Sequence, residues 1–536
     1  MADSGELGVI AAQTKLRRTF AIISHPDAGK TTLTEKLLLY AGMIRTAGMV
    51  KGRKARKAVS SDWMEMERER GISITASAMQ FLYKGVVINV LDTPGHQDFS
   101  EDTYRTLTAA DSAVMVIDAA SGVEEQTRKL FSVCRMRGIP ILTFINKMDL
   151  PGREPLELMA DVEEALDIQA SALNWPIGSG KAFVGVADRE AGDVILFEKQ
   201  GIGGSERAAS SRLSMEDAVA SGKVSSELHE QASYELELLN EAGNPFSRDA
   251  FLAGDVTPVF FGSALTNFGV EPFFDRFSSL APFPSARPVT LDSGEESIVE
   301  PVSEDFSAYV FKIQANMDPK HRDSMAFLRI NSGKFERDLV VKHKRSAKDV
   351  RLSRSHSMFG GERTTVDAAF PGDIVGVVNP GSFAIGDTIS TKGGFSFKPM
   401  PKFPPEVVAQ IRPKDLMKRK AFDKGIEQLK NEGAMLILRK FGQPNSEPLV
   451  AAVGRLQFDV LQFRLQTEYR VETQLDALPY SYGAWLVGDP KAFKPPSSAM
   501  LAEDGEGRVI MLCVREWEKQ YALEQNPQHK LLDFVD

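Results

Sequence analysis

Residues 17–32 read RRTFAIISHPDAGKTT, and this stretch decides the fold of the first part of the chain. Its first half is an apolar run that predicts a buried strand. Its second half, SHPDAGKTT, matches the phosphate-loop pattern G-x-x-x-x-G-K-[ST], except that Ser24 replaces the first glycine. We expect this turn position to accept serine if φ stays negative, while Gly29, against which the phosphates would pack, is retained.

Taken alone, the match is short enough to arise by chance, and its context strengthens it. It follows a predicted strand and opens a helix predicted over residues 30–40. The N–H groups of residues 27–32 would then converge on phosphate oxygens at the positive end of that helix. Lys30 would reach the outer phosphates, and the hydroxyl of Thr31 would bind Mg²⁺.

Two later stretches predict the rest of a nucleotide site. LDTPGH at residues 91–96 ends a predicted strand, so we expect Asp92 to hold Mg²⁺ through water and the N–H of Gly95 to reach a γ-phosphate. NKMD at residues 146–149 also ends a strand, and Asp149 can accept the two N–H donors of a guanine edge. Adenine does not offer that pair of donors, so the motif favours GTP over ATP.

GSAL at residues 262–265 ends the last apolar strand and fits a backbone contact to the guanine oxygen. All of these stretches lie at the carboxyl ends of predicted parallel strands, where open α/β sheets bind ligands. His96 would lie beside the γ-phosphate, where it could orient the attacking water. Ser73 in RGISIT (residues 70–75) is a further candidate ligand of Mg²⁺.

The predicted site is therefore a set of short motifs. The predicted GTP-binding residues are Ser24, His25, Pro26, Asp27, Ala28, Gly29, Lys30, Thr31, Thr32, Asp92, Thr93, Pro94, Gly95, His96, Asn146, Lys147, Met148, Asp149, Ser263, Ala264 and Leu265. The predicted metal ligands are Thr31, Ser73 and Asp92, and the predicted catalytic residue is His96.

Composition places the chain among ordinary globular proteins of several domains, with 536 residues, 43% hydrophobic residues and a net charge of −9. Its two cysteines, Cys134 and Cys513, fit neither a disulfide framework nor a metal site and favour a reducing compartment. The N-terminus has the reverse of a secretory charge pattern, and no apolar run is long enough to cross a membrane. We therefore expect a cytoplasmic protein with no membrane partner.

The pattern of elements predicts a multidomain protein. Residues 1–281 read as an α/β P-loop GTPase domain with a parallel sheet and an insertion at about 167–255, and residues 282–302 as a linker. Residues 303–396 read as a β-barrel. Residues 397–536 read as an α+β C-terminal domain that contains a ferredoxin-like βαββαβ unit.

Three segments are strongly basic on this acidic chain: residues 51–57, 342–354 and 412–420. Each one alone is typical of a solvated surface. Together they make a polyanionic partner a hypothesis worth testing. The segment 51–57 lies between the phosphate loop and RGISIT, which predicts that it belongs to a switch loop.

The stretches DAGKTT, RERGISIT, DTPGHQDF and NKMD resemble the translational GTPases, and the long insertion resembles that of the elongation factor G branch. Within that branch, ISHPDAGKTT, SDWMEMERERGISIT, NWPIGSGKAFVGVADR and GRLQFDVLQFRL look most like the release factor 3 family. The resemblance covers essentially the whole chain. Ser73 stands where many translational GTPases have threonine; serine keeps the hydroxyl for Mg²⁺ but lacks the methyl group whose packing helps to hold the loop.

The resemblance implies a GTPase that the ribosome activates and that promotes dissociation of class I release factors after peptide release. His96 would then face the sarcin-ricin loop of the large-subunit RNA, and GTP, GDP and Mg²⁺ would be bound. We expect a monomer. Only 65 residues follow Val471, too few for the two further domains that a translocase would use, so a translocase is the weaker alternative. The other alternative is a GTP- and GDP-sensing binding module whose hydrolysis is incidental.

Overall fold

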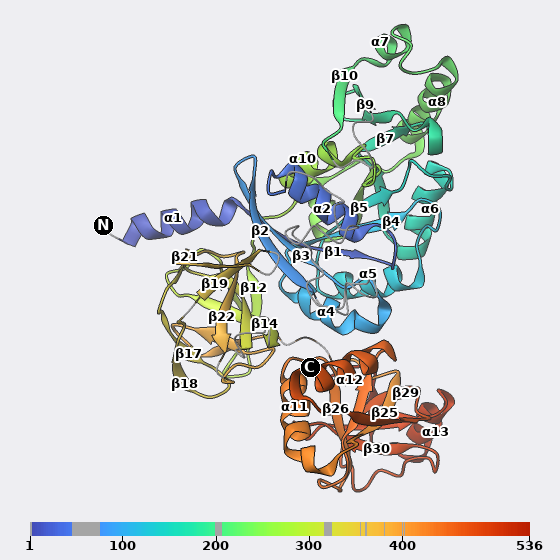
Figure 1. Cartoon of the computed structure of the whole chain (residues 1–536). Helices are drawn as coiled ribbons and strands as arrows, with labels where there is room; N and C mark the ends of the chain where they lie inside the picture. The colour runs from blue at the N-terminus through green and yellow to red at the C-terminus, as the bar shows by residue number, and fades with distance from the viewer. Residues whose placement is uncertain are drawn as a thin grey trace.

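The structure, a computed structural model, describes residues 3–44, 76–198, 206–315, 324–353, 355–359, 362–379, 381–398, 400 and 402–535. Figure 1 shows three bodies: a first domain with an insertion at its top, a β domain beside it and a C-terminal domain below. The predicted segments 51–57 and 70–75, Ser73 included, lie outside the described residues.

A seven-stranded sheet in the order β2-β3-β1-β4-β5-β11-β6 forms the centre of the first domain. Its strands are β1 (Arg17–Ser24), β2 (Ser77–Tyr83), β3 (Val86–Asp92), β4 (Ser112–Asp118), β5 (Ile141–Asn146), β6 (Gln169–Ala172) and β11 (Val256–Phe261). Every pairing is parallel except that of β2 with β3. The parallel sheet that the apolar runs predict is therefore confirmed. The antiparallel edge strand β2 is an addition that was not predicted.

Helices cover this sheet on both faces, as crossover connections require. They are α2 (Lys30–Tyr40), α4 (Ser100–Thr108), α5 (Glu125–Met136), α6 (Pro155–Leu166) and α10 (Val270–Leu280), with a short helix η2 (Gln97–Phe99) before α4 and a helix α1 (Asp3–Lys15) before β1. The sequence patterns predict helices over residues 30–40, 155–166 and 270–280, and these bounds are confirmed residue for residue by α2, α6 and α10. Helix α1, which projects from the domain in Figure 1, was not predicted.

The insertion begins later than the predicted residue 167. Residues Gln169–Ala172 (β6) pair in register with β11 and so belong to the main sheet. The insertion itself has its own sheet in the order β10-β9-β8-β7. Its elements are β7 (Asn174–Ile177), η3 (Gly180–Ala182), β8 (Gly185–Asp188), β9 (Val194–Glu198), β10 (Ala209–Leu213), α7 (Met215–Ala220), α8 (Ser226–Ala242) and α9 (Arg248–Ala253).

The predicted linker at residues 282–302 is wrong over most of its length. It contains β12 (Arg287–Leu291) and β13 (Glu296–Val299), which form a sheet with β24 (Phe395–Phe397). Its proline and acidic residues favour a linker by composition, but Val289 pairs with Phe397 and both side chains are buried. The segment is therefore an ordered part of the β domain.

The predicted β-barrel is an antiparallel sheet of eight strands in the order β18-β17-β23-β14-β15-β22-β19-β20, accompanied by the small sheet of β16 and β21. The strands are β14 (Ser307–Ala315), β15 (Ser324–Ser332), β16 (Phe335–Glu336), β17 (Val340–His343), β18 (Lys348–Arg351), β19 (Ser355–Phe359), β20 (Glu362–Thr365), β21 (Ala368–Ala369), β22 (Ile374–Asn379) and β23 (Thr388–Ser390). An apolar cluster that includes Val310, Leu328 and Ile389 fills the domain.

The ferredoxin-like prediction for the C-terminal domain is confirmed by the order β28-β25-β27-β26. The elements are β25 (Val407–Pro413), η4 (Leu416–Lys418), α11 (Arg419–Asn431), β26 (Leu436–Lys440), β27 (Leu449–Ala452), α12 (Leu456–Tyr469) and β28 (Thr473–Leu478). The last part of the chain extends the same sheet through β26 and β30. It consists of β29 (Tyr482–Val487), β30 (Met500–Glu503), β31 (Val509–Cys513), α13 (Trp517–Gln525) and β32 (Lys530–Leu532).

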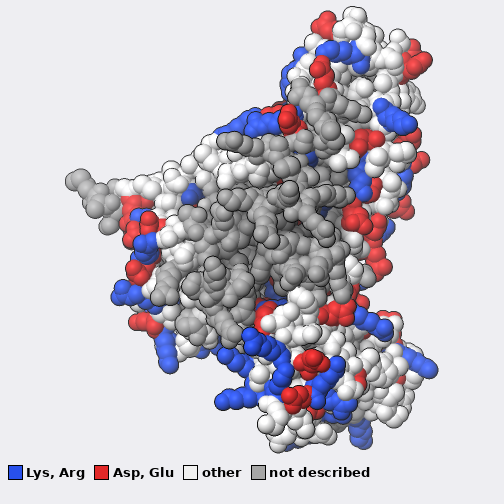
Figure 2. Space-filling view, viewed as in Figure 1, with Lys and Arg blue, Asp and Glu red and all other residues white. Residues whose placement is uncertain are grey.

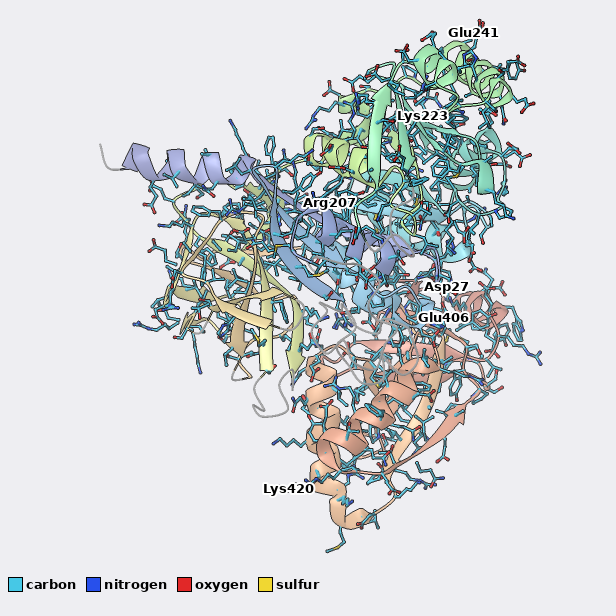
Figure 3. The ribbon with its side chains drawn as sticks, turned by 45° about the horizontal axis from the view of Figure 1, so that its top comes forward. Asp27, Arg207, Lys223, Glu241, Glu406 and Lys420 are labelled. Carbon is cyan, nitrogen blue, oxygen red and sulfur yellow. The ribbon has the colours of Figure 1, made fainter. Side chains whose placement is uncertain are left out.

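The basic segment 412–420 lies on the surface of this domain, at the start of α11. In Figure 2 blue side chains gather on the lower part of the molecule, where Figure 1 places α11. Several of these cations are already paired, such as Arg412 with Asp476 at 3.4 Å and Arg419 with Glu447 at 2.8 Å. Figure 3 shows Lys420 at the end of the domain that is remote from Asp27 of the phosphate loop. This segment therefore lies far from the predicted nucleotide site.

A buried polar network joins the first domain to the β domain. Arg329 and Asp111 form an ion pair at 2.6 Å, and Arg17 and Asp373 form a second one at 2.8 Å. The hydroxyl of Thr19 donates to the carbonyl oxygen of Gly372 at 2.7 Å. Because a buried charge is costly unless it is paired, these contacts favour the docked arrangement of the two domains over one in which the pairs are broken.

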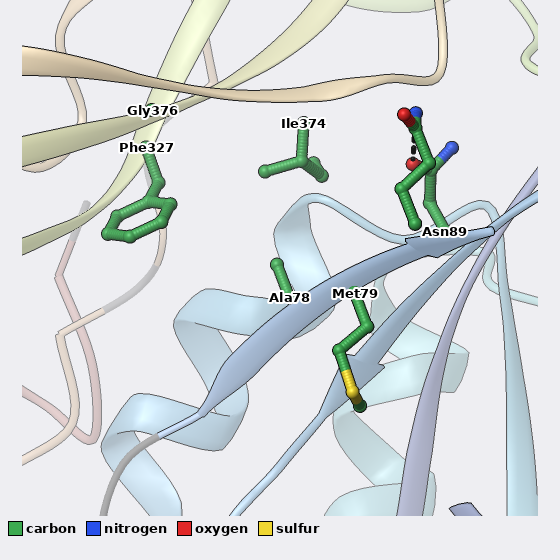
Figure 4. Close-up of a pocket in the computed structure, with 7 residues that line it drawn as sticks. Ala78, Met79, Asn89, Phe327, Ile374 and Gly376 are labelled. Carbon is green, nitrogen blue, oxygen red and sulfur yellow. Dashed lines mark hydrogen bonds between the residues drawn. The ribbon is translucent and has the colours of Figure 1, made fainter. Parts of the chain in front are cut away.

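A small cavity lies beside this network, where Gln80 donates to Asn89 at 3.0 Å (Figure 4). Phe327, Ile374 and Gly376 of the β domain close it from the other side. It encloses about 10 Å³, close to the minimum for a single water molecule. The cavity is therefore a packing feature of the interface and far too small for a nucleotide.

Neither cysteine takes part in a disulfide, and both are buried. Burial raises the pKa of Cys134 to about 12 and that of Cys513 to about 11, so both thiols stay protonated at neutral pH. Among the described residues, no helix combines the length and the apolar character that crossing a membrane would require.

Candidate nucleotide site

The phosphate loop connects β1 to α2 with the sharp backbone turn that its sequence predicts. Asp27 and Gly29 have φ values of 63° and 94°, in the left-handed region. At Gly29 a Cβ atom would also overlap the side chain of Asn146, so both conformation and space require glycine. Ser24 ends β1 outside that region, and its hydroxyl donates to the carbonyl oxygen of His25 at 2.9 Å. Serine is thus accommodated at this position without backbone strain.

The LDTPGH stretch lies directly against this loop. Lys30 pairs with Asp92 through Nζ and Oδ1 at 2.9 Å, and Nζ also donates to the carbonyl oxygen of Thr93. A Cβ atom at Gly95 would lie 3.8 Å from Lys30 and 3.9 Å from Pro26, which shows how closely the two stretches approach. The structure thus brings together two motifs that are more than sixty residues apart in sequence.

Asp92 has the donor chemistry that a magnesium ion requires. Its side chain is 2% exposed, and while Oδ1 accepts from Lys30, Oδ2 is buried without a hydrogen-bond partner. Such an oxygen is costly unless a cation or a water bound to a cation approaches it. Thr31 is half-buried at the start of α2. The described part of the predicted metal set therefore fits a hard divalent cation.

NKMD ends β5 and joins the phosphate loop to the GSAL stretch. The side-chain amide of Asn146 donates to the carbonyl oxygen of Ala28 at 2.7 Å, and its oxygen accepts from the N–H of Ala264 at 2.8 Å. Lys147 has a φ of 67° and pairs with Asp118 at 2.7 Å. The asparagine thus holds three separate stretches in register, a role that the sequence did not predict for it.

Of the two predicted base-contact groups, the carboxylate of Asp149 is the one with an atom free for a ligand. One carboxylate oxygen of Asp149, Oδ1, is buried and has no hydrogen-bond partner. The N–H of Met148 is already used, because it donates to the carbonyl oxygen of Gly262 at 3.1 Å. Ser263 and Ala264 are fully buried, whereas Leu265 is 52% exposed. The N–H groups of Ser263 and Ala264 already donate, to the carbonyl oxygen of Phe268 and to Asn146, each at 2.8 Å. Asp149 is therefore the clearest candidate contact with a base.

His25 lies inside the phosphate loop and is buried, with Nε2 3.5 Å from Oε1 of Glu124. Burial lowers the pKa of His25, and Lys147 acts in the same direction, while the nearby carboxylates of Glu124, Asp118 and Asp27 oppose the change. The imidazole is therefore neutral at neutral pH. Its Nδ1 has no hydrogen-bond partner.

His96 follows β3, and its side chain is 33% exposed. Its Nδ1 is 3.3 Å from Oδ1 of Asp98 and 3.2 Å from the backbone N of Asp98. Its ring also makes an edge contact with Phe99. The ring is thus held at one nitrogen and open to solvent elsewhere, as a residue that meets a bound nucleotide or an external partner needs to be.

Three residues next to this site were not predicted from the sequence. Asp98 contacts both His96 and the C-terminal domain. Lys312 of the β domain is buried and donates to the carbonyl oxygen of Ala76, and Asp102 accepts from the N–H of Ala76 at 2.6 Å. In the sequence, Lys312 is a single lysine within an apolar strand. That pattern does not reveal its contact with Ala76, which lies far away along the chain.

Models of known protein families match three successive parts of the chain. Residues 15–283 match the model of the elongation factor Tu GTP binding domain, 305–392 that of elongation factor G domain 2, and 397–523 that of the class II release factor RF3, C-terminal domain.

Relatives named peptide chain release factor 3 are similar over nearly their full length. Those from Symbiobacterium thermophilum and Gloeobacter violaceus are 51% and 52% identical and cover 97% of both chains. One from Synechocystis is 53% identical over 94% of this chain and 91% of its own. A crystal structure of a protein from Thermus thermophilus has a TM-score of 0.67 at 21% identity, covering 91% of this chain and 72% of that one. This last likeness concerns the fold alone.

Proposed function

The chain belongs to the peptide chain release factor 3 family and is a GTP-binding GTPase of translation termination. From this premise we propose that the ribosome activates it and that it promotes the dissociation of class I release factors after peptide release. The main support for this proposal is the contact between two motifs: Gly95 of LDTPGH lies close to Pro26 and Lys30 of the phosphate loop. A contact of this kind lets the presence of a γ-phosphate change the position of the segment that follows.

We assign the residues of this site as follows. Lys30 and the N–H groups of the phosphate loop hold the phosphates, and Asp149 accepts the N–H donors of guanine. Thr31 and Asp92, together with Ser73, hold Mg²⁺, which would neutralise charge on the phosphates. His96 orients the attacking water. The half-exposed ring and the unpartnered oxygens of Asp92 and Asp149 support these assignments.

We assign the ribosome, including the sarcin-ricin loop of its large-subunit RNA, as the partner that stimulates hydrolysis. Side chains from the C-terminal domain contact η2, the helical turn directly after His96. A large partner that binds both domains could therefore change the position of η2 and of His96. Basic residues at the start of α11 add favourable contacts with RNA phosphates without requiring a positively charged chain. Residues 397–523 match the model of the class II release factor RF3, C-terminal domain, which favours this family over a translocase.

The proposal is tested by GTP hydrolysis with and without purified ribosomes, for the wild-type protein and for His96→Ala. We expect strong stimulation of the wild type and loss of roughly 100-fold or more in the variant, the usual scale for a group that positions a reactant. A wild-type rate that ribosomes do not change would favour a nucleotide-sensing module with incidental hydrolysis. Full stimulation of His96→Ala would remove His96 from the catalytic assignment.

A further inference from the structure

Asp98 connects the histidine of LDTPGH to the C-terminal domain. It lies in η2, the single helical turn between β3 and α4, and it is buried. One carboxylate oxygen, Oδ1, is 3.3 Å from Nδ1 of His96, and the other, Oδ2, accepts a hydrogen bond from the backbone N–H of Leu456 at 2.7 Å. A single side chain therefore contacts both the proposed catalytic group and a domain that begins some 300 residues later.

The contacts at Nδ1 determine which ring nitrogen of His96 carries a proton. In the neutral ring, the backbone N–H of Asp98, 3.2 Å from Nδ1, favours an acceptor Nδ1 and therefore a proton on Nε2. The carboxylate oxygen Oδ1 of Asp98, 3.3 Å from the same nitrogen, favours the other tautomer, in which the N–H at Nδ1 donates to the carboxylate. The position of the Asp98 carboxylate therefore sets the balance between the two neutral tautomers as well as the orientation of the ring.

The C-terminal domain in turn fixes the position of Asp98. Leu456 begins α12, whose own N-cap residue Arg455 offers no side-chain hydrogen bond. The first N–H groups of a helix need an acceptor, and a carboxylate there is favoured by the helix dipole. Asp98 supplies that acceptor from the first domain. The helix therefore holds the carboxylate where it can also reach His96.

Gly454 shows how closely the two domains approach at this point. A Cβ atom on Gly454 would overlap all three terminal atoms of the Asp98 carboxylate. The φ of Gly454 is not positive, so the need for glycine here is one of space and not of backbone conformation. Any side chain at this position would push the carboxylate away from both Leu456 and His96.

Neighbouring contacts hold the same surfaces together without touching His96 through a polar group. Phe99 packs with Val460 and Leu456 of α12 in a small buried cluster. Arg105 of α4 donates to the carbonyl oxygen of Gly433 at 2.6 Å. Figure 1 shows α4 at the lower edge of the first domain, facing α12. The contact at Asp98 is therefore one part of a continuous interface.

We propose that Asp98 is a positioning residue for His96 and that the C-terminal domain sets this position through Gly454 and the N–H of Leu456. While the two domains are docked, the Asp98 carboxylate holds the ring at Nδ1. When the C-terminal domain shifts, Asp98 follows α12, and His96 loses its orientation. If binding to a partner moves the C-terminal domain, the rate of GTP hydrolysis therefore changes with it. This inference rests on the proposed role of His96.

The test combines a readout of the ring with a readout of the reaction. The chain is labelled with ¹⁵N-histidine, and the ring nitrogens of His96 are assigned by their loss in His96→Ala. The variants Asp98→Asn and Gly454→Ala are compared with Arg105→Gln, which removes an interdomain hydrogen bond that involves neither Asp98 nor His96. For each protein kcat and KM are measured for GTP hydrolysis on ribosomes, and thermal unfolding shows that it is folded.

The ¹⁵N shifts of the wild-type ring at pH 8 give the balance between the two neutral tautomers while the carboxylate is in place. In Gly454→Ala the displaced carboxylate no longer favours a proton on Nδ1, so this balance should shift toward a protonated Nε2, and kcat should fall between about 10- and 100-fold with little change in KM. Asp98→Asn should lower kcat likewise, which keeps the test open if Gly454→Ala does not fold. Arg105→Gln should match the wild type in both readouts.

Three results would overturn the inference: an unchanged His96 spectrum in Gly454→Ala, a rise in kcat in either Asp98→Asn or Gly454→Ala, or equal effects in Arg105→Gln. Failure of the proposed function would look different. If ribosomes fail to stimulate the wild type, or if His96→Ala hydrolyses GTP normally, the proposed function is wrong and the kcat values no longer report on the position of His96. The ring spectrum, measured without ribosomes, still decides whether Gly454 and Asp98 position His96.

Discussion

The guanidinium of Arg329 in the β domain lies 2.6 Å from the carboxylate of Asp111 in the first domain, and each side chain is only 2% exposed. Arg287 also pairs with Asp111, at 2.8 Å. Removing one member of a buried pair leaves the other charge without full compensation. Breaking this buried ion pair should therefore destabilise the contact between the two domains.

We predict that Arg329→Met lowers the free energy of unfolding by about 3 kcal/mol, the lower end of the range for breaking a buried pair, because Arg287 still compensates Asp111 in part. Urea denaturation measures the change. The control is Arg337→Met, which removes an exposed pair with Asp367 at 3.1 Å. Its effect should stay below about 0.5 kcal/mol. Equal effects in the two variants would show that burial does not decide the strength of the pair.

Gly29→Ala should abolish nucleotide binding. The residue has a φ of 94°, and a Cβ atom would overlap Asn146, so the phosphate loop must change shape to accept alanine. Titration with a fluorescent GDP analogue measures the loss. Gly42→Ala is the matched control, because its φ of 76° is similarly strained but nothing lies within 4 Å. It should cost about 1–2 kcal/mol of stability and keep binding. Normal binding by Gly29→Ala would contradict the assigned loop geometry.

Asp149→Asn should change the base preference. If Asp149 accepts two N–H donors of guanine, its loss removes two charge-assisted hydrogen bonds, each contributing about 1.5–3 kcal/mol, so GDP affinity should fall at least about 100-fold. Xanthine has an oxygen where guanine has an amino group, and the asparagine amide can donate to it. The ratio of GDP to XDP affinity is an internal control for general damage. Equal losses for both nucleotides would contradict a direct base contact.

His25 makes the stability of the nucleotide-free protein depend on pH. Burial lowers the pKa of His25, so the unfolded chain binds a proton at a pH where the folded protein does not. Stability from this group is complete above the ordinary histidine pKa of about 6.5 and falls as the pH drops below it. Melting temperatures of wild type and His25→Asn, measured from pH 8 to 5.5, should converge as the pH falls. Parallel curves would mean that His25 does not contribute.

Local patterns were sufficient to predict most of the first domain. The bounds of α2, α6 and α10 follow from helical periodicity next to glycine and proline signals, and the motifs lie at strand ends because parallel strands share one orientation. Asn146 shows the limit of that approach. Its motif predicts a base contact, while its side chain is engaged with Ala28 and Ala264, a pairing that only the folded loops bring about.

Long-range pairing explains what the sequence could not predict. The hairpin of β12 and β13 has the composition of a linker, and it is ordered because β24, about a hundred residues later, pairs with it. Asp98 and Leu456 are separated by 358 positions, and neither has a local pattern that indicates the other. Gly454 likewise reads as an ordinary turn residue until the carboxylate that it faces is known.

The central claim is tested most directly by measuring how fast a labelled class I release factor leaves a ribosome after peptide release. We predict that the wild-type protein with GTP accelerates this dissociation. Under the same conditions it should not move a peptidyl-tRNA complex. No acceleration of release factor dissociation, or efficient translocation of the peptidyl-tRNA complex, would contradict the function proposed for this chain.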